Sequence, residues 1–86
     1  MSDENNADES LFREHFDKVL SHRKIAAEIK SRGGHWKLLD ITGVSQRTRY
    51  IEYFFVLINE SNDAFAGNVK IDRQTGKLSD VEVRGC

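Results

Sequence analysis

The apolar residues divide the chain into a helical N-terminal third and a β-rich remainder. From Glu9 to Arg32 the sequence has many helix-forming residues and no helix breaker. At 100° per residue, however, its apolar side chains fall into two sets on nearly opposite sides of the helix. The first set is Phe12, Phe16, Val19, Leu20, Ala26 and Ala27, and the second is Leu11, Ile25 and Ile29. One straight helix on one sheet would leave one of these sets exposed.

Two arrangements of the helical region resolve this conflict. In the first, the helix breaks near Ser21, a good N-cap residue, and each half turns its own apolar side inward. In the second, the helix is continuous and its first half packs on another surface, such as a second copy of the chain. We favour the break. In both arrangements Gly33-Gly34 ends the helix after Lys30 and Arg32, as expected at a helix C-terminus.

Four β-strands are expected after the helical region. Their predicted ranges are His35–Val44, Tyr50–Ile58, Ala64–Asp72 and Leu78–Val83. The second range is β-branched and aromatic on both faces, which is typical of a central strand covered at least in part on both sides. In the first strand, Leu39 and Ile41 are expected on one face. The short connections from residue 50 onward favour an antiparallel meander, closed by a tight hairpin from Asp72 to a left-handed Gly76.

These elements predict an α+β fold, with one or two N-terminal helices packed on a four-stranded antiparallel sheet in the order α(α)ββββ. Residues 1–8 are acidic and almost free of apolar groups, which predicts a flexible acidic tail. Residues 9–86 are then a single α+β domain, because 86 residues have room for only one modest core.

The net charge of −1 conceals three blocks of different sign. Residues 1–9 carry −4, residues 10–49 carry +5 and residues 50–86 carry −2. The basic segment 23–49 suggests a nucleic-acid-associated protein as an alternative function. The bases that would meet phosphate are Arg23, Lys24, Lys30, Arg32, Lys37, Arg47 and Arg49. A solvated helix face is the preferred interpretation, because neither interleaved exposed aromatics nor a reading motif is evident.

The sequence offers no convincing catalytic group, metal site or cofactor site, and we expect a protein that is not an enzyme. Cys86 is the single cysteine, so neither an internal disulfide nor a cysteine-based metal site is expected. The first residues do not resemble a signal peptide, and the longest apolar run, Tyr53–Ile58, is far shorter than a membrane span. We therefore expect a cytoplasmic protein with no membrane partner.

Two segments resemble the PepSY domain family. Ile25–Gly34 is similar to the helix of that family, which ends in a small-residue corner. Val69–Leu78 is similar to its last hairpin, in which apolar positions flank an Asp-x-x-Thr-Gly turn. The resemblance covers Ser21 to about Val83 and implies a non-catalytic domain that binds, and in some relatives inhibits, a protein partner. Cystatin-like and small immunity-type proteins have a similar outline.

The favoured hypothesis is thus a small non-enzymatic module that binds a protein, and inhibition of that protein is one version of this hypothesis. The partner is either another protein or a second copy of this chain in a homodimer. The two-phase helical region and the aromatic strand together offer more apolar surface than one small core needs. The candidate binding residues are Leu11, Ile25, Ile29, Trp36, Tyr50 and Tyr53.

Overall fold

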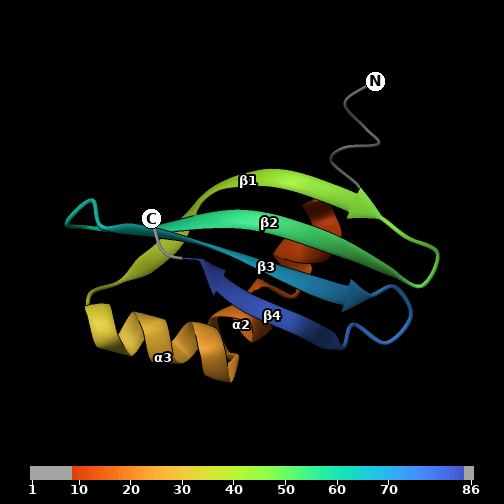
Figure 1. The fold of residues 1–86 in the computed structure, drawn as a ribbon, viewed down its shortest axis with the longest axis horizontal. Coiled ribbons are helices and arrows are strands. Elements are labelled where there is room, and N and C mark those ends of the chain that lie inside the picture. The colour runs from red at the N-terminus through yellow and green to blue at the C-terminus, as the bar shows by residue number, and fades with distance from the viewer. Residues whose placement is uncertain (1–8, 85–86) are drawn as a thin grey trace.

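The fold is described from a computed structural model, which describes residues 9–84 (Figure 1). A helical segment, 9–14, is followed by two helices and four strands. These are α2 (Phe16–Ser21), α3 (Arg23–Arg32), β1 (Trp36–Gln46), β2 (Tyr50–Asn59), β3 (Ala64–Asp72) and β4 (Leu78–Arg84). The predicted flexible tail, 1–8, and Cys86 lie outside the described residues.

The four strands form one antiparallel sheet in the order β1-β2-β3-β4, so the predicted α+β class and meander are confirmed. The helical region differs in one detail, because it contains three short segments rather than one or two helices. In Figure 1, α3 runs beside the edge strand β4, with α2 next to it. No helix within residues 9–84 is long and apolar enough to span a membrane.

The predicted break in the helix is confirmed, but its cap is His22 rather than Ser21. His22 adopts an extended conformation (φ −61°, ψ 141°), and its Nδ1 accepts from the backbone N–H of Lys24 at 3.2 Å. The Ser21 hydroxyl instead donates back to the carbonyl of Asp17 at 2.9 Å, which closes α2. The extended residue re-aims α3, so Ile25 joins Phe12 and Val19 in one core, whereas Ala27 of the first apolar set is exposed.

The core lies between the helices and one face of the sheet. Its fully buried members come from the helical segments and from alternate residues of the strands. They are Phe12, Val19, Ile25, Tyr53, Phe55, Leu57, Phe65, Val69 and Ile71. The Phe12 ring centroid lies 5.1 Å from that of Tyr53 and 5.2 Å from that of Phe55, so the first helical segment is packed directly on β2.

The prediction that Leu39 and Ile41 lie on one face of the edge strand β1 is wrong. The register with β2 shifts between Leu38 and Asp40, and again between Ile41 and Gly43, which leaves Leu39 and Thr42 as extra residues. A bulge changes which side chains point to each face. Leu38 and Ile41 therefore pack against the core, whereas Leu39 is 55% exposed. Two bulges also make β1 a poor template for a further strand.

The β3–β4 hairpin has the predicted turn. Gly76 has a positive φ of 73°, and its backbone N–H donates to the carbonyl of Asp72 at 2.9 Å. The Asp72 carboxylate accepts from the backbone N–H groups of Gln74 and Thr75 at 2.8 and 2.9 Å. Aspartate at the first position and glycine in the left-handed position thus act as the sequence indicated.

Candidate functional site

The two faces of β2 have different neighbours. Ile51, Tyr53, Phe55 and Leu57 are buried beneath the helices, whereas the alternate residues point to the opposite face and are half-buried. On that opposite face we define the open sheet face as Leu39, Tyr50, Phe54, Val56, Ile58, Ala64 and Ala66. The helical core residues pack on the other face, so this apolar surface is left uncovered by the described helices.

Charged side chains border the open sheet face. The guanidinium of Arg84 lies 5.6 Å from the Phe54 ring centroid, and Lys70 Nζ lies 4.9 Å from that of Tyr50. Lys70 Nζ also contacts Asp80 Oδ2 at 2.8 Å. This hydrogen bond raises the pKa of Lys70 and lowers the pKa of Asp80. The apolar surface therefore has a charged rim, which is the usual anatomy of a protein interface.

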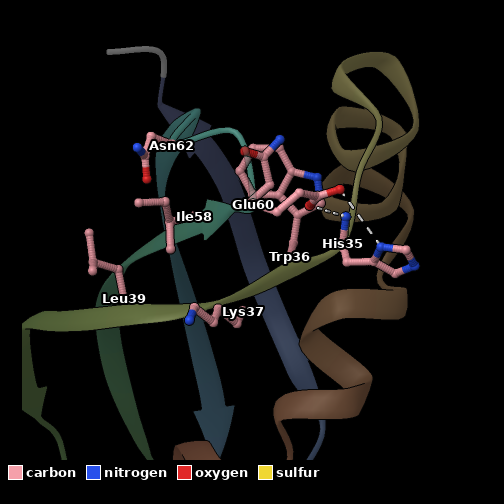
Figure 2. Close-up of a pocket in the computed structure, with 8 residues that line it drawn as sticks. His35, Trp36, Lys37, Leu39, Ile58, Glu60 and Asn62 are labelled. Carbon is pink, nitrogen blue, oxygen red and sulfur yellow. Dashed lines mark hydrogen bonds and ion pairs between the residues drawn. The ribbon is translucent and has the colours of Figure 1, made fainter.

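A hollow of about 620 Å³ continues the open sheet face at the start of β1 (Figure 2). It is lined by His35, Trp36, Lys37, Leu39, Ile58, Asn59, Glu60 and Asn62. Trp36 Nε1 and Asn59 Nδ2 both donate to the carbonyl of Gly33, at 2.9 and 3.3 Å. Two residues that line the hollow are thus hydrogen-bonded to Gly33, the C-cap residue of α3.

Glu60 holds the corner between α3 and β1. Its Oε1 accepts from the backbone N–H of His35 at 2.8 Å, and its Oε2 lies 3.8 Å from His35 Nδ1 (dashed in Figure 2). The bond from the His35 backbone is the largest of the effects that lower the pKa of Glu60. The ionised carboxylate is therefore the form that holds the corner in place.

Replacing Glu60 with glutamine is expected to remove part of the acid sensitivity of this corner. Because folding lowers the pKa of Glu60, the stabilising effect of the ionised carboxylate is complete above pH 4.5, the ordinary pKa of this group. The effect is lost as the pH falls through the lowered pKa of the folded state. The His35 amide resonance of the wild type should shift across this acid range. The same resonance in Glu60→Gln should show no titration from this group, and an unchanged titration would contradict the assignment.

The six predicted protein-binding residues do not form one surface. Ile25 and Tyr53 are completely buried in the core, so the prediction that they contact a partner is wrong. Leu11 and Ile29 are half-buried and pack against the same core. Trp36 packs against Phe65 with ring centroids 5.0 Å apart and borders the hollow. Of the six, Tyr50 alone belongs to the open sheet face.

Six residues of this surface were absent from the predicted set, namely Ala64, Ala66, Leu39, Phe54, Val56 and Ile58. The signal for the last three was in the sequence, because β2 is apolar at both odd and even positions. Leu39 had no such signal, since its exposure depends on the bulge in β1.

The seven bases proposed for nucleic acid are not gathered on one face. Arg32 is held by Glu28 at 2.6 Å and Asp63 at 2.9 Å, and these contacts raise the pKa of Arg32. Lys24 contacts Glu82 at 3.6 Å. Arg47 and Arg49 follow the end of β1 that lies away from α3 (Figure 1). Lys37, near the other end of β1, pairs with Ile58 of β2, whereas Gln46 pairs with Ile51, so these two positions lie roughly 23 Å apart along the strand.

Within residues 9–84 no three histidine, cysteine or acidic side chains come together in a way that could hold a metal ion. Comparison with protein-family models, with curated proteins and with solved structures gave no match. The resemblance to PepSY domains therefore stays a prediction.

Proposed function

We propose that this chain is a small non-enzymatic protein-binding module whose contact surface is the open sheet face. The observation that carries the proposal is the row Phe54, Val56 and Ile58, which lies on the sheet face opposite the helices. Contiguous apolar surface with a polar rim is typical of protein interaction sites, and aromatic residues are enriched in them. The PepSY resemblance of the sequence implies the same class of function.

The carboxyl groups support a non-catalytic role. The pKa values of Glu60, Asp72 and Asp80 are all lowered, by backbone N–H groups in the first two and by Lys70 in the third. A carboxyl group that acts as a general acid near neutral pH needs a raised pKa instead. Each of these three groups has a structural partner that accounts for its shift.

We also propose a cytoplasmic location. It is supported by the single cysteine, because small exported domains usually depend on several disulfides.

The alternative function, a nucleic-acid-associated protein, has weaker support because two of its seven bases, Lys24 and Arg32, are paired with acidic side chains. Salt-dependent binding to nucleic acid would be the observation that favours it.

Affinity capture with Val56→Lys tests the role of the open sheet face. The tagged wild-type chain is expected to retain one or more proteins from an extract of the source cells, and Val56→Lys is expected to lose them. Placing an unpaired charge in an apolar contact costs several kcal/mol, or roughly 100-fold or more in affinity.

Val44→Lys is the matched control. Val44 is also a half-exposed valine on a strand, 39% exposed, but it pairs with buried Tyr53 and so belongs to the opposite face. It should retain the same proteins as the wild type. Equal capture by wild type and Val56→Lys, with both chains folded by circular dichroism, would contradict the proposal.

A further inference from the structure

The open sheet face consists of a ridge beside a groove. Along β2 the outward residues are large: Phe54, Val56 and Ile58. Their direct partners on β3 are smaller, namely Asn68, Ala66 and Ala64 in the same order. Directly paired residues on neighbouring strands share a face, so each large side chain stands next to a small one. The surface is therefore raised along Val56 and Ile58 of β2 and lowered along Ala66 and Ala64 of β3, whereas the Arg84 side chain lies over Phe54 and Asn68.

A ridge beside a groove of the same length is complementary to its own copy. Consider a two-fold axis that runs parallel to the strands, between two stacked sheets and midway between β2 and β3. This axis keeps the position of each residue along the strand direction and places β2 of one copy over β3 of the other. It seats Val56 over Ala66 of a second copy and Ile58 over its Ala64. An axis perpendicular to the strands would instead set one β2 ridge against the other.

The charges around the face agree with the same axis. Asp40 pairs with Val56, and Arg84 pairs with Ala66, so the two charges stand at opposite edges of one row. The axis brings Asp40 of one copy opposite Arg84 of the other, twice by symmetry. Glu52 and Lys70 are direct partners in the next charged row. The axis places Glu52 of each copy opposite Lys70 of the other copy. Opposite charges thus meet at all four places.

We infer that the occupant of the open sheet face is a second copy of this chain, stacked face to face about a two-fold axis that runs along the strands. The inference rests on the proposed function, because it uses the same surface, and it names the partner. The homodimer expected from a continuous helix loses that basis because the helix is broken at His22. The sheet supplies a different basis, namely complementarity in both shape and charge.

The size of the face sets the strength of this association. The ten residues of β2 and the four strands of the sheet give a face of roughly 33 by 15 Å at the usual strand spacings. Two copies would bury about 1,000 Å², which is near the lower limit for a specific interface. The dimer is therefore expected to be reversible, and its population should depend on chain concentration.

Sedimentation equilibrium of the full 86-residue chain tests the inference directly. The wild type and Val44→Lys should convert from monomer to dimer as concentration rises, with equal dissociation constants. Val56→Lys should weaken the dimer by at least about 100-fold. A monomer at all concentrations, or a dimer unaffected by Val56→Lys, would overturn the inference. If capture of another protein by this face persists in a monomeric chain, the proposed function stands and only the second copy is excluded.

A mixing experiment tests the orientation without any apolar substitution. Asp40→Lys alone and Arg84→Glu alone should each weaken dimerisation by about 10-fold, because each places like charges opposite each other twice. When the two variants are mixed, every contact again joins opposite charges, so a heterodimer of wild-type strength should form. The contacts within each chain are unchanged by mixing. Failure of the mixture to recover association would overturn the proposed axis.

Discussion

Replacing Phe12 with alanine is expected to lower the free energy of unfolding by about 3–5 kcal/mol, the usual cost of removing a buried phenylalanine. The ring is completely buried and lies within 5.6 Å of three other aromatic rings, measured between centroids, those of Phe16, Tyr53 and Phe55. A domain of this size has a total stability of roughly 4–13 kcal/mol. The substitution therefore removes a large share of it, and thermal unfolding followed by circular dichroism should show a midpoint lower by more than about 12 °C.

Arg13→Ala is the control for Phe12→Ala. Arg13 is the next residue of the same helical segment, is exposed, and contacts Glu9 at 3.5 Å in a solvent-exposed ion pair. Such pairs contribute little, so a change within about 0.5 kcal/mol is expected. Both variants should be measured at one fixed chain concentration, because association stabilises the folded state. A decrease of less than about 1 kcal/mol in the free energy of unfolding of Phe12→Ala would mean that the packing of residues 9–14 on the sheet contributes little to stability.

The helical half of the molecule was only partly predictable. The two apolar phases correctly indicated a break near Ser21, since Phe12 and Ile25 cannot reach one core from one straight helix. The sequence could not identify His22 as the cap, because histidine is not among the preferred N-cap residues. It also could not assign Ile25 to the core rather than to a partner. That assignment depends on the direction that α3 takes after the break.

The sheet was predicted more fully because its signals are local. The ends of β3 agree with the predicted range, and Asp72 and Gly76 form the expected turn. The bulges of β1 were not predictable, because Leu38 and Leu39 are adjacent and equally apolar. Only pairing with β2 decides which of them enters the core. One open residue of the candidate surface, Leu39, was missed for this reason.

The apolar character of the open sheet face could be predicted from the sequence, but not which face of the sheet the helices cover. The apolar character of β2 on both faces predicts partial cover on both sides. The helices cover the face that carries Tyr53, and Tyr50 lies on the other. Composition indicates that a face is apolar but not whether the same chain covers it. Within residues 9–84, the three short helical segments lie on one side of the sheet and leave the second face uncovered by helix.

Gly67→Ala is expected to destabilise the domain by about 1–3 kcal/mol, because it adds a methyl group where the core has no room. A Cβ at this position would lie 2.9 Å from the carbonyl oxygen of Glu82 and 2.9 Å from Cζ of Phe55. The first obstacle is backbone of β4. The second is a buried ring that cannot move away, since Phe12 packs against it. Denaturant unfolding at fixed chain concentration should show a lower midpoint with an unchanged slope.

Gly43→Ala separates this steric effect from the general effect of replacing a strand glycine. A Cβ at Gly43 would approach Cδ1 of Phe54 at 3.3 Å, and that ring is half-buried on the open sheet face, where its neighbour is the exposed side chain of Arg84 rather than the core. Alanine also loses less backbone entropy on folding than glycine, by about 0.5–1 kcal/mol, which favours both variants equally. The Gly43 variant should therefore differ from the wild type by less than about 1 kcal/mol. Equal stability of the two variants would mean that the Phe55 ring is free to move, and that the core beneath the open sheet face is looser than its packing indicates.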